Sequence, residues 1–365
     1  MSVLQTPITK MFNIQHPVML AGMNVAAGPE LAAAVSNAGG LGVIGGLGLV
    51  TRTFFKNPPM LNLSTGYTPK NLRNQIREIK KHLKSPDLPF GVDLLIPKVG
   101  DGARATNYDY TKYVLFNFFS PKKHNTNTYL PSTLLRVPPK SVVDKLHEAK
   151  IPIMNMIGHP KHVAYALNAG VDIICAQGGE GGGHTGNIPT SLLIPACVDL
   201  VKGKTSPLTG EPIRIVAAGG IYDGRGLAAA LMWGASAVWV GTRFVAAVEA
   251  SAPKKHKDLI LSAGYDDVEK TLIYTGRPLR VRATPYVKDW NNNRADEIKK
   301  LTSQGTIPHD AELEKKPEKS MEGRSWLMGT VAGAITEVLP AQKIVEDMVN
   351  DAKACIKSGS EMAKL

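Results

Sequence analysis

The sequence has few cysteines, no long hydrophobic run and no leader-like N-terminus. Only Cys175, Cys197 and Cys355 occur among 365 residues, and no two of them have CxxC spacing. A disulfide framework and a zinc site are therefore not indicated, and we expect a reducing compartment. No apolar stretch approaches the roughly 20 residues of a membrane-spanning helix. Since the charged-then-apolar pattern of a signal peptide is also missing, the sequence predicts a soluble, intracellular protein.

What the chain does have is an excess of positive charge. Its 43 Lys and Arg residues against 31 Asp and Glu give a net charge of +12, which favours anionic partners such as phosphorylated cofactors. The basic residues are dispersed, and short clusters such as Lys122-Lys123 and Lys254-Lys255 belong to no nucleic-acid motif. We therefore expect a solvated basic surface and no nucleic-acid partner.

Short apolar segments bounded by glycine or proline alternate with stretches of helical spacing. This alternation is typical of βαβ units around a parallel sheet. Strands buried on both faces are expected over residues 17–20, 41–44, 90–96, 152–157, 172–177, 213–218 and 237–240. Helices are expected over residues 32–38, 68–83, 141–150, 159–169 and 224–233. Periodicity alone leaves open whether the sheet closes into a (β/α)8 barrel or is doubly wound.

The chain is longer than a plain barrel, which takes about 250 residues. From about residue 264 to residue 324 the sequence carries many charges, scattered proline and glycine, and weak periodicity. We expect a barrel over residues 1–263 and an insertion lobe over 264–325. The C-terminal part, residues 326–365, is predicted to be a helix from Trp326 to Ile356 that packs on the barrel, interrupted near Pro340 and followed by a tail.

The pattern is weakest between Tyr113 and Val137, where a barrel needs its fourth strand and helix. The strand is expected over residues 114–119 or over residues 134–137. The proline, asparagine and threonine residues that follow residue 119 do not favour a helix. We therefore predict an atypical fourth βα unit.

The densest motif is the segment AQGGEGGGHTG, which spans residues 176–186 and directly follows a predicted strand. Three of its glycines match GxGxxG, but no helix opens within the loop and no acidic residue ends the next strand, so we reject a dinucleotide fold. Glycines let the backbone approach a flat or charged ligand closely. We therefore interpret His184 as a functional side chain at the carboxyl end of a strand, the alternative being a structural histidine.

Two further glycine loops follow consecutive predicted strands. Gly219-Gly220 lies in the first loop, and Gly241-Thr242 opens the second. In a barrel, the loops after the seventh and eighth strands commonly form a phosphate site. The alternative is a pair of tight turns needed only for packing. Near the N-terminus, Gly22-Met23-Asn24 ends the first strand on small and polarizable residues that suit contact with a flat ring.

Several segments together carry a family resemblance: HPVMLAGM, PFGVDLL, the GGEGGGHTG loop, AAGGIYDGRG with VWVGTRF, and AGAITEVLPAQKIV. Across most of its length the chain resembles the nitronate monooxygenase family, formerly called 2-nitropropane dioxygenases. The resemblance implies an FMN-binding (β/α)8 barrel without a metal. It also implies the oxidation of alkyl nitronates or nitroalkanes with O2 to carbonyl compounds and nitrite.

By their places in these motifs, the residues implied to contact the flavin are Gly22, Met23, Asn24, Gln177, Gly182 and Gly183. Those implied to bind its phosphate are Gly219, Gly220, Gly241 and Thr242, and His184 would be the catalytic base. Where the family usually has asparagine near the flavin, this chain has Asp93. A carboxylate donates a hydrogen bond only when it is protonated, so Asp93 either alters the redox potential of the ring or faces elsewhere.

Other functions stay open on this resemblance. The same superfamily contains NAD(P)H:quinone reductases and enoyl-thioester reductases, and the atypical fourth unit is compatible with a catalytically silent flavin-binding protein. A homodimer is one possible oligomeric state. The chain ends in Ala363-Lys364-Leu365, a variant of the Ser-Lys-Leu address read by the peroxisomal import receptor. We therefore expect a cytoplasmic or peroxisomal location.

Overall fold

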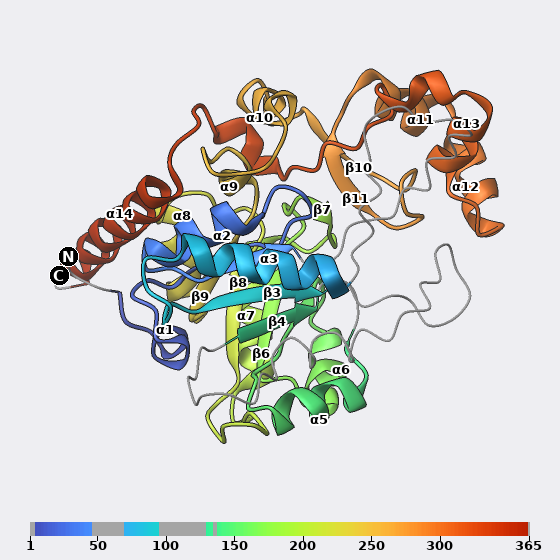
Figure 1. Cartoon of the computed structure of the whole chain (residues 1–365). Helices are drawn as coiled ribbons and strands as arrows, with labels where there is room; N and C mark the ends of the chain where they lie inside the picture. The colour runs from blue at the N-terminus through green and yellow to red at the C-terminus, as the bar shows by residue number, and fades with distance from the viewer. Residues whose placement is uncertain (1–3, 46–68, 95–128, 134–136, 364–365) are drawn as a thin grey trace.

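Eight parallel strands close into a barrel in the computed structural model, which describes residues 4–45, 69–94, 129–133 and 137–363 (Figure 1). The strand order is β1 (Val18–Leu20), β9 (Ala237–Val240), β8 (Arg214–Ala218), β6 (Ile173–Gln177), β5 (Met154–Ile157), β4 (Tyr129–Thr133), β3 (Phe90–Leu94) and β2 (Gly42–Gly45). A parallel bridge between Met19 and Leu41 joins β1 to the β2 end and closes the sheet. The predicted (β/α)8 barrel is confirmed.

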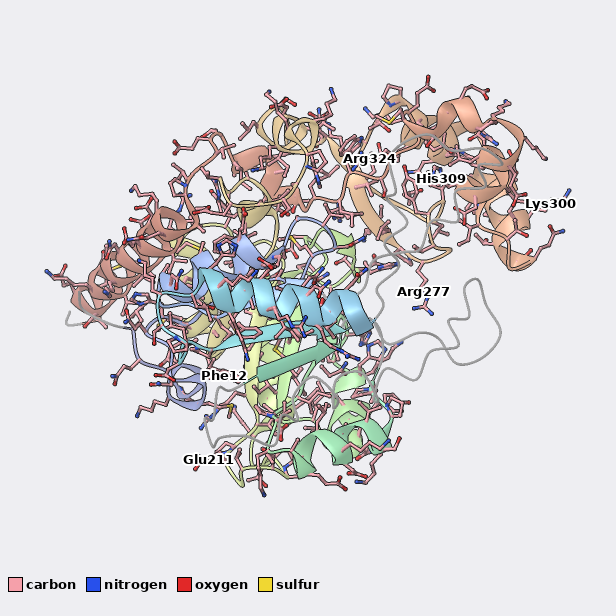
Figure 2. All side chains as sticks on the ribbon, viewed as in Figure 1. Phe12, Glu211, Arg277, Lys300, His309 and Arg324 are labelled. Atoms are coloured by element: carbon pink, nitrogen blue, oxygen red, sulfur yellow. The ribbon has the colours of Figure 1, made fainter. Side chains whose placement is uncertain are left out.

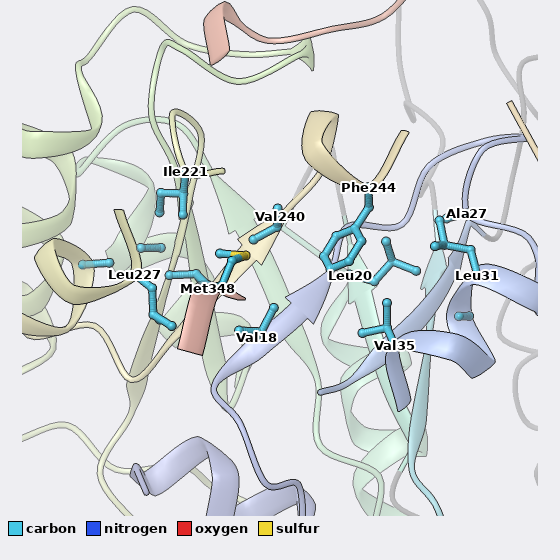
Figure 3. Packing of buried hydrophobic residues seen from close by; sticks show 14 of the residues in the cluster. Val18, Leu20, Ala27, Leu31, Val35, Ile221, Leu227, Val240, Phe244 and Met348 are labelled. Carbon is cyan, nitrogen blue, oxygen red and sulfur yellow. The ribbon is translucent and has the colours of Figure 1, made fainter. Parts of the chain in front are cut away.

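Helices surround the barrel on its outside. They are α2 (Pro29–Asn37), α3 (Pro69–His82), α5 (Lys140–Glu148), α6 (His162–Ala169), α7 (Thr190–Val201), α8 (Gly224–Met232) and the short α9 (Thr242–Val245). Side chains of a strand point alternately to the two faces of the sheet. Val18 and Leu20 accordingly join the cluster between sheet and helices, together with Val35 (Figure 3), whereas Met19 lies in the cluster inside the barrel.

The first helix, α1 (Pro7–Phe12), closes the end of the barrel that lies opposite the lobe. Its side chains Ile8 and Phe12 are fully buried and belong to the cluster inside the barrel, with Met154 and Val216. Phe12 is labelled in Figure 2 at the lower side of the barrel, away from the lobe. The barrel interior is therefore a packed core, as the burial of the strands on both faces predicts. None of the described helices is both long enough and apolar enough to span a lipid bilayer.

The fourth strand does not lie where the sequence placed it. Residues 114–119 and 134–136 lie outside the described residues, and the structure describes β4 over Tyr129–Thr133. Its register, Phe90 with Tyr129 and Leu94 with Thr133, is set by pairing with β3. The segment reads YLPST, and a proline with two hydroxyl residues lacks the apolar pattern of a central strand. Pairing with its neighbours, and not local propensity, makes this segment a strand.

The predicted helix from Trp326 to Ile356 is wrong in its first half. Before Pro340 the chain forms a bridge at Leu327 and a short 3-10 helix, η2 (Thr330–Ala334). Trp326 and Met328 are both buried, and a spacing of two suits an extended chain better than a helix. The helix proper, α14 (Ala341–Met362), begins after Pro340 and packs on α8 and α2.

Residues 264–325, expected to be weakly periodic, form a compact lobe at the carboxyl end of the barrel (Figure 1). The lobe contains a hairpin of β10 (Val268–Thr271) and β11 (Leu279–Arg282), then α11 (Pro285–Asn293), α12 (Ala295–Ser303), α13 (Pro308–Lys315) and η1 (Pro317–Ser320). Helix α10 (Lys254–Leu261) precedes it. The lobe has its own core around Trp290, Tyr274 and Val281. Its many charges include Glu312, which is buried and accepts a hydrogen bond from Trp290 Nε1 at 2.9 Å.

Candidate functional site

The site residues expected from sequence lie at or just beyond the carboxyl ends of five strands. Gly22, Met23 and Asn24 follow β1, and Asp93 is the second-to-last residue of β3. The glycine loop with His184 follows β6, Gly219 and Gly220 follow β8, and Gly241 and Thr242 follow β9. In a closed parallel barrel these ends lie on one rim, where barrel enzymes place their active sites. The fold therefore gathers on that rim residues that are spread over more than half of the chain.

Neighbouring loops on this rim approach closely at glycines. A Cβ added to Gly241 would lie 3.7 Å from Sδ of Met23, which places the β9 and β1 loops together. A Cβ added to Gly219 would lie 2.8 Å from the carbonyl oxygen of Gly178, which places the β8 and β6 loops together. Larger residues at Gly219 would push these two backbones apart.

Asp93 lies beneath the β1 loop and is only 3% exposed. A Cβ added to Gly22 would lie 2.1 Å from Cβ of Asp93, so only glycine fits there. Burial, and next the charge of Asp93, raise the pKa of the Cys175 thiol, which lies on strand β6 inside the barrel. Asp93 thus points into the barrel below Gly22, toward Cys175.

The β1 loop is strained just after Asn24. Val25 has a φ of 64°, which a β-branched residue rarely adopts. The amide of Ala26 donates to the carbonyl of Asn24 at 2.7 Å, so Val25 is the centre of a tight three-residue turn. Strain of this kind persists where the surroundings fix the backbone, and it clusters at ligand sites. The turn leaves Asn24 exposed at the rim.

The loop that carries His184 is tied to itself by several hydrogen bonds. Gln177 donates its side-chain amide to the carbonyl of His184 at 2.7 Å, and Thr185 donates its hydroxyl to the carbonyl of Gly178 at 2.9 Å. Gly183 has a φ of 69°, a conformation that glycine adopts at little cost. The backbone of His184 is therefore held in place, and Gln177, expected at the flavin, also spans its own loop.

The lobe holds the same loop from the other side. Gly183–His184 forms the two-residue strand β7, which pairs antiparallel with β11 in the register His184 with Leu279. Arg280 donates to the carbonyl of Gly179 at 2.9 Å, and Lys270 donates to the carbonyl of Gly186 at 3.2 Å. Sequence reasoning missed these two cations, because nothing local distinguishes them from the other charges of the lobe.

The imidazole of His184 is kept neutral by its surroundings. Burial, and next the positive charge of Arg277, lower its pKa from 6.5 to about 4. Figure 2 shows Arg277 extending from the lobe on the side that faces the barrel. Nε2 of His184 lies 3.0 Å from the hydroxyl of Thr275 in the turn between β10 and β11. At neutral pH the ring thus has one protonated nitrogen and one lone pair available to accept a proton.

The two loops expected at the phosphate both have suitable backbone donors. Gly219 and Gly220 have φ values of 86° and 74°, in the left-handed region that favours glycine. Thr242 begins α9, and the first turn of a helix leaves amide hydrogens without helical acceptors. The Thr242 hydroxyl accepts from the amide of Gly329 at 2.9 Å and keeps its own hydrogen to donate.

Sequence reasoning also missed a segment that crosses the glycine loop, residues 327–330. Besides the Gly329 contact with Thr242, the amide of Thr330 donates to the carbonyl of Glu180 at 3.0 Å. A Cβ added to Gly182 would lie 2.6 Å from the backbone of Met328. We call residues 327–330 the strap. The sequence analysis assigned this apolar stretch to a helix and therefore did not predict that it crosses the glycine loop.

A cleft of about 270 Å³ opens beside Gly220. Its wall includes Glu180, Thr190, Tyr222, Tyr265 and Thr330. The Glu180 carboxylate accepts hydrogen bonds from the amide of Thr190 at 3.1 Å and from its hydroxyl at 2.8 Å. The carboxylate is therefore engaged in joining the glycine loop to the start of α7.

Comparison with known proteins decides the family. The family model for nitronate monooxygenases matches residues 5–351. The chain belongs to the nitronate monooxygenase family. A Staphylococcus saprophyticus protein named as a nitronate monooxygenase is 28% identical over 319 residues, covering 79% of this chain and 81% of that protein. A Mycobacterium tuberculosis protein, named an octahydroindene-carboxyl-CoA dehydrogenase, is 34% identical over 285 residues. The match covers 78% of this chain and 68% of that protein.

Solved structures show the same barrel. FabK from Thermotoga maritima is 26% identical and superposes with a TM-score of 0.74, covering 99% of this chain and 100% of that one. Nitroalkane oxidase from Streptomyces ansochromogenes, 22% identical, shares the fold with a TM-score of 0.73 over 96% of this chain and 99% of that one. The family member described here is a flavin-dependent oxidoreductase. The rim fits a flavin, since its glycines, amide donors and the thioether of Met23 meet at one edge.

His184 should titrate far below an ordinary histidine, with a midpoint of about 4. An NMR titration of protein with 15N-labelled histidine measures this, and the His184→Asn variant assigns the signal. Because the folded pKa lies below the unfolded value, the unfolded state binds more protons between the two, and stability falls as pH drops through this window. Arg277→Gln should raise the midpoint only in part, since burial is the larger cause. A wild-type midpoint near 6.5 would contradict the burial of the ring.

Proposed function

We propose that this protein is an FMN-dependent nitronate monooxygenase that oxidises alkyl nitronates and nitroalkanes with O2 to carbonyl compounds and nitrite. The observation that carries the proposal is the neutral imidazole of His184, held on the rim among three glycine loops. Family membership and the name of the S. saprophyticus relative support the same activity. No step requires a metal.

In this proposal the phosphate of FMN binds the amides of the β8 and β9 loops, at Gly219, Gly220, Gly241 and Thr242. Left-handed glycines bring backbone N–H groups close to an anion without a side chain in the way. The ring would lie against Gly22, Met23, Asn24, Gln177, Gly182 and Gly183, with Asp93 below the β1 loop. When bound there, FMN would accept the electrons that leave the substrate.

His184 would act as the base that removes the Cα proton of a neutral nitroalkane. A ring with a pKa of about 4 is neutral at physiological pH and so is always in the form that accepts a proton. Its low proton affinity is offset as the reaction proceeds, because the nitronate anion formed beside it favours the protonated ring. The charge of Arg277 would attract that anion and keep the free ring neutral.

A second candidate is an oxidoreductase of acyl or enoyl thioesters that uses NAD(P)H. The M. tuberculosis relative named for a carboxyl-CoA substrate and the FabK structure favour it. Mixing the protein with NADH or NADPH in the absence of O2 separates the two candidates. Rapid loss of flavin absorbance supports an NAD(P)H-dependent reductase of thioesters or quinones, whereas bleaching only with nitronate supports the first candidate. Any such turnover excludes a catalytically silent flavin-binding protein.

Gly220→Asp should abolish FMN retention. The new side chain places a negative charge beside a nearly dianionic phosphate, and partial burial strengthens the repulsion. Flavin content is measured by absorbance and by release of FMN on denaturation. Gly203→Asp is the matched control, because Gly203 has a similar φ of 71° but open space around an added Cβ. Full flavin in Gly220→Asp would refute the phosphate assignment.

His184→Asn should separate the two substrates. A nitronate has already lost its Cα proton, whereas a neutral nitroalkane still needs a base. General-base catalysis contributes about 10² to 10⁴ in rate, so nitroalkane oxidation should fall by about that factor and nitronate oxidation much less. O2 consumption and nitrite release measure both rates. Flavin content should stay unchanged, and an equal loss with both substrates would make His184 a structural or binding residue.

A further inference from the structure

The turn between β10 and β11 brings the hydroxyl group of Thr275 within hydrogen-bonding distance of the His184 imidazole. Gly276, with a φ of 67°, closes this turn by donating its amide to the carbonyl of Leu272 at 2.8 Å. Oγ1 of Thr275 lies 3.0 Å from Nε2 of His184. The same oxygen lies 3.3 Å from the carbonyl oxygen and 3.4 Å from the amide nitrogen of Arg277. One hydroxyl therefore has three polar neighbours.

Counting hydrogens assigns the direction of these contacts. A threonine hydroxyl has one hydrogen to donate and two lone pairs. The amide of Arg277 only donates and its carbonyl only accepts. If the Thr275 hydroxyl donates to that carbonyl, His184 must donate through Nε2–H, and all three contacts are hydrogen bonds. If the hydroxyl instead donates to Nε2, the contact with the Arg277 carbonyl is lost. The first arrangement makes three hydrogen bonds at the Thr275 hydroxyl and the second makes only two, which favours the first in a partly buried turn.

This arrangement fixes which nitrogen of the neutral ring carries the lone pair. With the proton on Nε2, the acceptor is Nδ1, which makes no hydrogen bond to any residue in the described part of the chain. The backbone of His184 is already held by its pairing with Leu279 and by the amide of Gln177. The Thr275 hydroxyl is thus the contact that sets the orientation of the ring itself.

We propose that Thr275 is a positioning residue for His184, holding the neutral imidazole as the Nε2–H tautomer so that Nδ1 accepts the substrate proton. Applied to the proposed function, on which this part rests, the Cα–H bond of a nitroalkane breaks and an Nδ1–H bond forms. The electron pair moves onto the nitro group, which gives the nitronate. Thr275 touches neither the substrate nor the flavin in this scheme, and it acts only through the ring.

The tautomer can be read directly by 15N NMR of the flavin-loaded protein with labelled histidine, at a pH above the imidazole pKa. We expect a protonated Nε2 and an unprotonated Nδ1 in the wild type and in Thr275→Ser. In Thr275→Val, which keeps the shape and removes the hydroxyl, we expect a mixture of tautomers. A proton on Nδ1 in the wild type would overturn the proposal, and so would an unchanged spectrum in Thr275→Val.

Kinetics provide the second readout. Thr275→Val should lower kcat with a neutral nitroalkane by about fivefold to tenfold, the effect of one hydrogen bond, with KM and nitronate turnover unchanged. Thr275→Ser should restore most of the rate. The control is Thr302→Val in the same lobe, where the hydroxyl donates only to carbonyl groups of its own helix α12. Equal losses with both substrates, or no rescue by serine, would make Thr275 merely structural. If the wild type oxidised neither substrate, the proposed function would fail while the NMR result still decided the role of Thr275.

Discussion

The pairing of β11 with the two-residue strand β7 is the interaction on which the site depends. Through this pairing, a lobe with its own core holds the glycine-rich loop in place. The loop itself has few side chains that could pack and fix its position. Arg280 and Lys270 add bonds to carbonyls at both ends of the loop. A loop with this many glycines is costly to order, because glycine loses more conformational freedom on folding than any other residue. The lobe supplies the contacts that offset this cost and hold His184 in one place.

The same contacts between the lobe and the loop determine the electrostatics of the rim. Lys270, Arg277 and Arg280 all come from the hairpin of the lobe and lie around the loop that carries His184. Burial by the lobe and the positive charge of Arg277 act in the same direction on the imidazole, and both favour its neutral form. A cationic rim with a neutral base suits the binding or formation of an anion. Part of the net positive charge thus lies beside His184, the residue proposed as the base.

The local hydrophobic pattern of the sequence predicted most strands of the barrel correctly. It failed at β4 and at residues 326–339. Seven strands were predicted to within about two residues, because strands buried on both faces read as short apolar runs bounded by glycine or proline. β4 was missed because YLPST has no such pattern and becomes a strand only by pairing between β3 and β5. Residues 326–339 were misassigned because an apolar run indicates that a segment is buried but does not show whether it is helical or extended. Lys364 and Leu365 of the predicted peroxisomal address lie outside the described residues.

The sequence by itself determined which residues lie on the rim, because glycine loops after parallel strands meet at the carboxyl end of a barrel whatever the rest of the chain does. His184, Gly219, Gly220 and Gly241 all follow from that rule. Only the tertiary structure decided what surrounds them: Thr275 is 91 residues from His184, and the strap at Gly329 is 87 residues from Thr242. Side chains that act by contact across such separations have no local signal, since their effect depends on distance in space and not on the neighbours in the chain.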